Sequence, residues 1–390
     1  MPPDARHLVR LTAGWALLAD FIPLYAVYAL LFADHGMSDA QISALFALWS
    51  VVGVLAEIPS GAVADRFTRR SSLVTSGVFQ AAGYLTWLAQ PSFAGFAAGF
   101  VLWAIGGSFV SGALEALVYD GLAADGVADR YAEVYGRISA LGLLTQVAAT
   151  ALAAPLFVVG EYRLVGGVSV AACLASSLVA ARLPEPLRAG GGDDEDDRGY
   201  LTLLRTGIKD AASTPAMRTA IVAVGLLSGV DAFEEYVPLL ARNWGVPTGA
   251  TPLATIGIPV VAALGAAYAG RADRLRPPVL GAMLGAGGFL LVAAAIAARP
   301  AGLIGVTLFY GLYRVVWVVA GARLQQEIES TARATVTSVA GFGTELAALL
   351  LFAAWAIGGL PLTAAGVLLL AAALPRWLKM AGRRDAREGA

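Results

Sequence analysis

The stretch that decides the fold is Gly61-Ala-Val-Ala-Asp65-Arg66-Phe-Thr-Arg69-Arg70, a short charged segment between two long apolar runs. Its small residues let two helices approach closely at a tight turn, and the acid and arginines that follow form a charge cluster. The neighbouring runs, residues 39–64 and 71–90, are long enough to cross a bilayer as α-helices, which takes about 20 residues. The segment therefore predicts a charged loop that joins two transmembrane helices.

Further apolar runs follow this pair along the whole chain, and together they predict an all-α membrane protein with twelve transmembrane helices. The first run is too long for the apolar core of a cleaved signal, so we expect a retained helix. Long, continuous apolar runs favour helices over the short alternating strands of a barrel. Of the 390 residues, 58% are hydrophobic and 14% charged, too apolar for one water-soluble core. The expected helices are residues 8–33, 39–64, 71–90, 93–122, 130–158, 162–182, 217–243, 249–271, 278–298, 302–326, 332–358 and 361–380.

The longest polar interruption, residues 183–216, divides the helices into six and six. It contains two prolines, a glycine run at 190–192 and an acidic run at 193–197, which favours a solvated linker over an ion-binding site. We expect four parts: an N-terminal six-helix bundle (1–183), a cytoplasmic linker (184–216), a C-terminal six-helix bundle (217–380) and a cytoplasmic tail (381–390).

The basic residues predict the orientation. Loops on the side of the two termini carry most of the arginines, whereas the opposite loops carry only Arg163, Arg242 and Arg299. Since Lys and Arg concentrate on the cytoplasmic side, both termini are expected there. The preference for Arg over Lys, with abundant Ala and Gly, suggests a GC-rich bacterial genome, hence a bacterial cytoplasmic (inner) membrane. The net charge of −1 argues against a nucleic-acid partner.

The 61–70 stretch resembles the loop signature of the major facilitator superfamily, G-x-x-x-D-R-x-G-R-R, with Thr68 where the family usually has Gly. A degenerate second copy follows the eighth run, where Ala269 and Gly270 precede Asp273 and Arg274. The copies occupy the same place in each half, as in the two parallel six-helix repeats of this superfamily. The resemblance thus covers nearly the whole chain and implies the pseudo-symmetric two-bundle fold.

The resemblance also implies a gating latch. In the superfamily, the acid and arginines of this loop hold the two halves together in one conformation, with an acid at the cytoplasmic end of the fourth helix. Asp120 stands at that position here. Topology alone is the alternative, because basic residues are expected in cytoplasmic loops. The latch residues implied are Gly61, Asp65, Arg66, Arg69, Arg70 and Asp120.

Ionisable residues interrupt the apolar runs near mid-membrane, where each costs about 2.5–3.5 kcal/mol on insertion scales. Asp231, Glu234 and Glu235 recur at i, i+3 and i+4, so they share one face of the seventh helix. Asp20 lies at an equivalent depth in the first helix. The one firm mid-membrane cation in the sequence is Arg314, so most of these acids lack a basic partner in their layer.

A carboxyl group in that position favours its neutral form and can take and release a proton as a cavity opens to each side. We expect proton coupling by at least one acid, with Asp20 and Asp231 as first choices. The alternative is that the acids are neutral and hydrogen-bonded within the bundle, or lie at a wet mouth. The proton-coupling candidates are Asp20, Asp231, Glu234 and Glu345.

Aromatic residues crowd the same region, and in the superfamily helices one, four, seven and ten line the central cavity. Aromatic walls with a few acids suit amphipathic molecules, including cationic ones, although ordinary helix packing explains many such rings equally well. The substrate-cavity candidates are Tyr28, Trp103, Glu235, Tyr310, Arg314 and Trp317.

These patterns favour a secondary active transporter that exports small hydrophobic or amphipathic compounds by proton-coupled alternating access. There is no Walker-type sequence and the two histidines are isolated, so no cofactor, metal or enzymatic activity is expected. Expected partners are a small-molecule substrate, protons and the lipid bilayer, with the chain a monomer. The alternatives are proton-coupled uptake of a nutrient and a non-transporting receptor on the same scaffold. A membrane-embedded enzyme is disfavoured, because no nucleophile–base pair stands out.

Overall fold

The computed structural model describes residues 1–66, 68–110, 112–185, 215–272, 274–327 and 333–381; side chains of residues 57–66, 215–217, 220, 324–327, 333–340 and 379–381 lie outside the description. Within these ranges every regular element is a helix and no strand occurs, which confirms the all-α prediction. The α-helices up to the central linker are α1 (Pro3–Ala19), α2 (Tyr28–Asp34), α3 (Asp39–Arg66), α4 (Arg69–Ala89), α5 (Phe93–Ser108), α6 (Ala113–Ala124) and α7 (Tyr131–Ala180). Those after the linker are α9 (Pro215–Gly229), α10 (Val237–Asn243), α11 (Thr251–Thr255), α12 (Gly257–Ala272), α13 (Pro277–Ala297), α14 (Gly302–Glu327) and α15 (Arg333–Ala381). Short 3₁₀ helices are η1 (Pro23–Ala26), η2 (Ala128–Arg130), η3 (Val230–Tyr236) and η4 (Thr248–Ala250).

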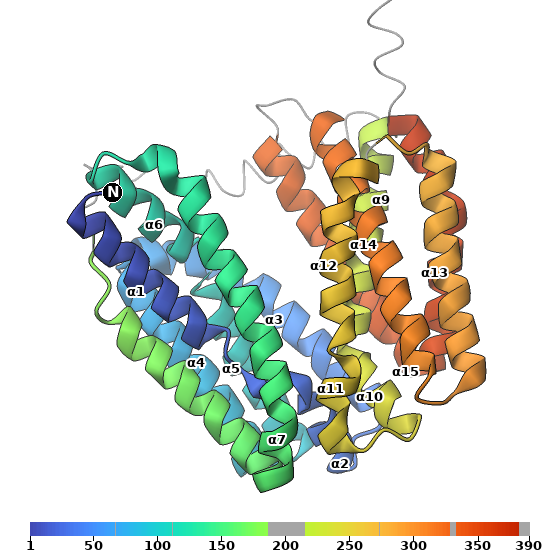
Figure 1. The fold of residues 1–390 in the computed structure, drawn as a ribbon, viewed down its shortest axis with the longest axis horizontal. Coiled ribbons are helices and arrows are strands. Elements are labelled where there is room, and N and C mark those ends of the chain that lie inside the picture. Colours follow the sequence, from blue (N-terminus) through green and yellow to red (C-terminus); the bar gives the residue numbers. More distant parts are fainter. Residues whose placement is uncertain (67, 111, 186–214, 273, 328–332, 382–390) are drawn as a thin grey trace, which may run out of the picture. The chain divides into compact units, whose positions relative to one another are not determined.

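Two long helices each contain two membrane passes. The backbone of α7 turns at Gly160–Glu161, so its second arm returns beside α4 (Figure 1). The backbone of α15 turns at Gly359, whose φ of 55° suits glycine. Eight described stretches are long and apolar enough to cross a membrane, and two of them, Ala128–Ala180 and Gly341–Leu378, contain these turns. With α4 and the α9–η3–α10 segment, the described chain accommodates the twelve expected passes.

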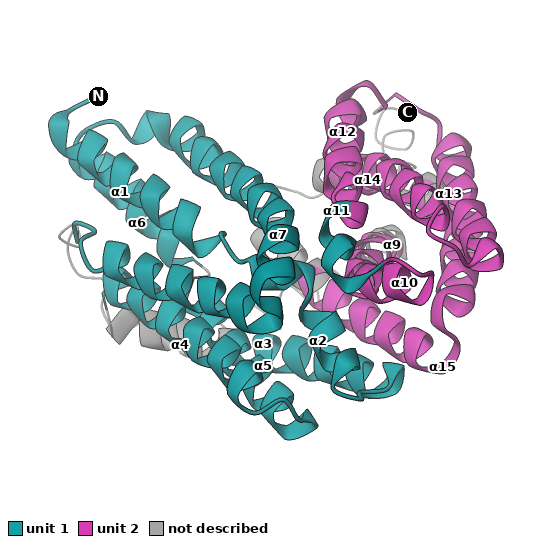
Figure 2. Ribbon diagram, turned by 60° about the horizontal axis from the view of Figure 1, so that its bottom comes forward, with its two compact units in different colours: residues 1–193, 247–253 teal, residues 194–246, 254–390 magenta. Residues whose placement is uncertain are grey.

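The chain forms two compact units, residues 1–193 with 247–253 and residues 194–246 with 254–390 (Figure 2). In unit 1, α4 packs against α5 and α7, α1 against α7, and α3 against α5. In unit 2, α15 packs against α9 and α13, while α14 packs against α12 and α13. Each unit is therefore a helical bundle with its own core.

Small residues set how closely these helices pack. A Cβ at Gly83 of α4 would lie 2.8 Å from the carbonyl oxygen of Gly99 on α5, a distance that real side chains do not reach. Such close backbone contact is a main source of helix association in lipid, where hydrophobic burial between helices gains little. The many glycines of the chain thus serve packing as well as turns.

Four expected helices are interrupted where the sequence predicted continuous runs, and the eighth (249–271) is one of them, since Ile256 separates α11 from α12. The first run (8–33) breaks between Ala19 and Pro23, and the fourth (93–122) breaks before Gly112, which has a φ of 74°. The seventh (217–243) changes to a 3₁₀ helix at Val230–Tyr236, just before Pro238. Proline lacks the N–H that an α-helix needs, so both proline-associated breaks have a local cause.

Candidate functional site

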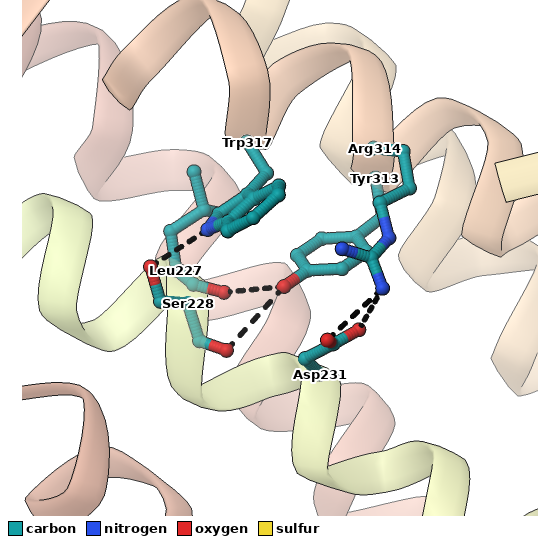
Figure 3. Close-up of polar contacts among 6 residues, drawn as sticks. All are labelled: Leu227, Ser228, Asp231, Tyr313, Arg314 and Trp317. Carbon is teal, nitrogen blue, oxygen red and sulfur yellow. Dashed lines mark hydrogen bonds and ion pairs between the residues drawn. The ribbon is translucent and has the colours of Figure 1, made fainter. Parts of the chain in front are cut away.

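The mid-membrane cation and one of the acids form a direct ion pair in unit 2. Nη2 of Arg314, on α14, donates to both carboxylate oxygens of Asp231 at 2.7 and 2.9 Å (Figure 3). The guanidinium lies 5.0 Å from the ring centre of Trp317 and 5.8 Å from that of Tyr313. Aromatic faces attract cations, so these rings and the carboxylate together compensate the buried charge.

Two hydrogen bonds tie the same stretch of α14 to the last turn of α9. The hydroxyl of Tyr313 donates to the carbonyl of Leu227 at 2.9 Å, and Nε1 of Trp317 donates to Oγ of Ser228 at 2.7 Å (Figure 3). Tyr313 and Ser228 were not among the predicted site residues. Their spacing gives a signal: Ser228 lies one turn before Asp231, and Tyr313 is the residue before Arg314.

Two further acids lie near this ion pair. Glu234 is close enough to Asp231, Glu235 and Arg314 to interact with all three electrostatically. Glu235 is half-buried and engaged in an interaction of its own. Because η3 has three residues per turn, Asp231 and Glu234 lie one above the other along the helix, rather than on the broader α-helical face that the sequence predicted. The guanidinium of Arg314 thus has one acid in direct contact, Asp231, and a second, Glu234, within electrostatic range.

Unit 1 holds the other first-choice acid in a different setting. Asp20 directly follows the last residue of α1, and its Oδ1 accepts a hydrogen bond from Nε2 of Gln146 at 3.0 Å. Its carboxylate lies against the backbone of α7, where a Cβ at Gly142 would come within 2.3 Å of Oδ2. Among the residues that the structure describes, no basic side chain pairs with Asp20.

Gln146 and Gly142 are site residues that the sequence did not predict. They lie four residues apart on α7 and so face the same side of that helix. The sequence contained a signal for them, because a polar amide and a glycine lie one helical turn apart within an apolar run. Their contact with Asp20 joins positions 126 residues apart, so only the folded chain reveals it.

The predicted cavity aromatics divide into two groups. Tyr28 is 4% exposed and stacks on Trp87 with 5.7 Å between ring centres, while Tyr310 is fully buried and stacks on Phe233 at 6.0 Å. These two rings therefore belong to the cores of their own units instead of lining a cavity. Trp103 and Trp317 are only half-buried and keep part of their ring surface accessible. Trp103 also stacks on Trp49 at 5.0 Å.

The predicted latch is described only in part, because the side chains of Gly61, Asp65 and Arg66 lie outside the described residues. Arg69, at the start of α4, forms an ion pair with Asp120 of α6 and donates to the carbonyl of Ala116 at 2.7 Å. The side chain of Arg70 is exposed. These described contacts join helices within unit 1.

Glu185 is a residue of this charged cluster that sequence reasoning missed. Its carboxylate accepts the backbone N–H groups of Arg69 and Arg70 at 3.0 and 3.1 Å, and so caps the N-terminus of α4. Thr68, which replaces the family's glycine, contributes a second cap by accepting the N–H of Ser71 at 3.2 Å. The threonine thus has a structural role of its own.

Glu345, the remaining proton-coupling candidate, is half-buried on α15 and engaged in an interaction. Across the part of the chain that the structure describes, no group of three or more potential metal ligands comes together. The candidate site thus consists of two separate acid centres, one at Asp20 in unit 1 and one at Asp231 in unit 2.

Comparison with known proteins bears on the whole chain. A family model described as the Major Facilitator Superfamily matches residues 11–352. No curated protein sequence matches. Similar solved structures include the nucleoside transporter NupG, with 13% identity, full coverage of both chains (100% each) and a TM-score of 0.72. A bacterial homolog of the human lysosomal transporter Spinster has 16% identity and a TM-score of 0.70, covering 98% of this chain and 96% of that one. A D-xylose-proton symporter has 13% identity and a TM-score of 0.69, covering 96% and 97%. At these identities the similarity shows the fold alone.

Proposed function

Because the chain belongs to the major facilitator superfamily, a family of membrane transporters, we propose that it is a secondary active transporter. It exports small hydrophobic or amphipathic compounds by alternating access and draws energy from the proton gradient. The observation that carries this proposal is the contrast between the two acid centres. Asp231 already holds Arg314, whereas Asp20 accepts a hydrogen bond from the amide of Gln146 and has no basic partner among the described residues.

The Asp20 carboxylate is suited to exchange. The Gln146 amide is a neutral donor, so its hydrogen bond leaves the charge of an ionised Asp20 carboxylate without a cation to balance it. A proton or the positive head of an amphipathic substrate can each neutralise this carboxylate. Because both ligands compete for one group, binding of either releases the other, which is the physical basis of antiport.

The Asp231 centre has a complementary role in this proposal. Arg314 compensates Asp231, and Glu234 adds a second carboxylate close enough to interact with both. The half-buried face of Trp317, already in contact with the guanidinium, offers an apolar and cation-attracting surface to the ring or tail of a substrate. Unit 2 thus contributes substrate contact, and unit 1 contributes the site of proton exchange.

We place the chain in a bacterial inner membrane as a monomer, with both termini and the 184–216 linker in the cytoplasm. The excess of arginine in the loops on that side supports this orientation. In it, the Arg69–Asp120–Glu185 cluster lies at the cytoplasmic face, where the proposed latch of Gly61, Asp65, Arg66, Arg69, Arg70 and Asp120 would act.

Proteoliposomes with an imposed pH gradient test the proposal. Purified protein should move lipophilic cations against their concentration gradient when the side into which they are exported is acidic, and Asp20→Asn should lower that flux by about ten- to a hundredfold, the loss expected for one charge-assisted contact. Asp129→Asn, at an exposed acid between the predicted spans 93–122 and 130–158, is the matched control and should leave flux unchanged. Flux that ignores the gradient, or survives Asp20→Asn, contradicts proton coupling at Asp20.

Uptake of a nutrient by proton symport is the second candidate, favoured by the similarity to a D-xylose-proton symporter. The same vesicles distinguish it. Under symport, sugars or nucleosides would enter from the acidic side together with protons, and lipophilic cations would show no gradient-driven movement. That result would reverse the direction proposed here and leave the transporter assignment intact.

A further inference from the structure

Unit 2 contains an apolar groove that the proposed transport cycle does not use. It has a volume of about 480 Å³ and lies between α9 and the two arms of α15 on either side of Gly359. Small residues, among them Ala347 and Gly366, form its floor, and large exposed residues such as Leu350 (57% exposed) and Leu369 (73% exposed) form its rim. The hollow therefore opens at the surface of the bundle.

The chemistry of the lining selects an apolar occupant. Among the lining residues, the two side chains with polar groups are Thr363 and Trp377. The hydroxyl of Thr363 already donates to the carbonyl of Gly359 at 3.0 Å. An apolar hollow of this kind is not stabilised by water, and its walls lose dispersion contacts when it is empty. At membrane depth, the surrounding solvent that can fill it is the lipid acyl chain.

The length of the groove and the basic residues at its end indicate where the acyl chain and the headgroup of a lipid would lie. From Leu362 to Trp377 the groove follows 15 residues of helix, or about 22 Å, somewhat more than the ~15 Å half-thickness of a bilayer's hydrocarbon core. Arg376, beside Trp377, is exposed at one end of this path. The sequence beyond it adds four more basic residues, Lys379, Arg383, Arg384 and Arg387. Basic residues and a tryptophan at the end of a span are typical of a headgroup contact with anionic lipid.

We propose that this groove binds one acyl chain of an anionic phospholipid, with the lipid phosphate against Arg376. The site lies beside the transport machinery, because Gly229 and Val230 line the groove and directly precede Asp231. A bound chain supports the backbone at the point where α9 changes to the 3₁₀ helix η3. The proposal concerns lipid binding and holds whichever solute the protein carries.

Photo-crosslinking in bilayers tests the proposal with the wild-type chain. Phosphatidylglycerol with a diazirine on its acyl chain should label peptides that contain residues 226–230, 347–354 and 362–377. Its yield should exceed that of phosphatidylcholine with the same chains by about fivefold, the factor for one arginine near an anionic headgroup. Arg376→Gln should remove this preference and leave the labelling by phosphatidylcholine.

A groove-filling variant supplies the second test. A Cβ at Gly366 would meet nothing within 4 Å, so Gly366→Leu can start its side chain without a clash and place its apolar end in the hollow. Labelling of the groove should fall by about tenfold, as expected when roughly two methylenes lose their contacts. Ala365→Leu, at an exposed neighbour that does not line the groove, is the matched control.

Three outcomes would overturn the lipid site. One is labelling spread evenly over all lipid-facing helices; another is wild-type labelling in Gly366→Leu. The third is a dimer in native mass spectrometry that dissociates in this variant, because a second copy of the chain would then cover the groove. If Gly366→Leu fails to fold, the phosphatidylglycerol preference and its loss in Arg376→Gln decide the question.

Discussion

The two acid centres, Asp20 in unit 1 and Asp231 in unit 2, lie at equivalent places in their halves and solve the same problem differently. Each carboxylate follows the end of a broken helix, at α1 and at α9–η3. Asp231 is neutralised by a guanidinium, whereas Asp20 has an amide and a glycine surface. The difference teaches that internal symmetry of the backbone does not extend to the chemistry of the site.

The different partners of Asp20 and Asp231 suggest different roles for the two acids in transport. An acid that holds an arginine gains little from a proton, because protonation would leave the arginine's charge uncompensated. When an acid that is hydrogen-bonded to neutral groups alone takes up a proton, no cation is left uncompensated. Under the proposed function, we therefore expect proton exchange at Asp20 and a fixed charge pattern that orients substrate at Asp231. The predictions below separate these roles.

The largest effect is expected when the ion pair of unit 2 is broken on one side. Arg314→Gln leaves Asp231 without its cation and should lower the free energy of unfolding by about 2 kcal/mol. This value lies between the ranges for exposed and buried pairs, because the Arg314 side chain is 20% exposed and the Asp231 side chain 38%. Thermal unfolding in detergent measures the loss. Adding Asp231→Asn to Arg314→Gln should recover most of it, and a double variant no more stable than Arg314→Gln would show that the pair is not the source.

A smaller and more selective effect is expected from Gly142→Ala in unit 1. The new methyl group would occupy the place of Asp20 Oδ2 and push the carboxylate away from Gln146, at a cost below about 1 kcal/mol because the Asp20 side chain can move. Gradient-driven flux should fall by about tenfold while stability hardly changes. Gly136→Ala on the same helix, where a Cβ meets nothing within 4 Å, is the control. Equal flux in the two variants would remove Gly142 from the site.

The outline of the fold was predictable from the sequence, because apolar runs of membrane length leave few alternatives in lipid. Counting along those runs also predicted that Asp231 and Arg314 lie at similar depths, and the structure pairs their side chains. The breaks at Asp20 and at Val230–Tyr236 did not follow, since hydropathy does not register a missing backbone hydrogen bond. Pro23 and Pro238 were the local signals for those breaks.

The partners of the site residues were less predictable than the residues themselves. Asp20 meets Gln146, and Glu185 caps α4 more than a hundred residues away, through helix registers that packing sets. Tyr28 and Tyr310 were predicted to line a cavity, but both rings are buried within their own units. The position of a ring along an apolar run does not show whether it faces the core or a cavity. A single sequence predicts how far along a helix a side chain lies. It predicts which face of the helix carries that side chain only where the periodic pattern is unbroken.

The smallest effect is expected at Glu133, whose surface ion pairs give a standard for comparison with the Asp20 and Asp231 centres. Glu133, at the start of α7, contacts Arg130 at 2.9 Å and Arg137 at 2.8 Å, and the side chains of Arg130, Glu133 and Arg137 are 35%, 41% and 72% exposed. Water and salt screen such pairs, so Glu133→Gln should leave the melting temperature unchanged within error. Raising the salt concentration should reduce any remaining difference in melting temperature between Glu133→Gln and wild type. The loss of stability in Arg314→Gln should persist in high salt, because lipid and protein exclude ions from that pair. A salt-sensitive Arg314→Gln would place the unit 2 centre in water and remove the contrast on which the assignment of roles depends.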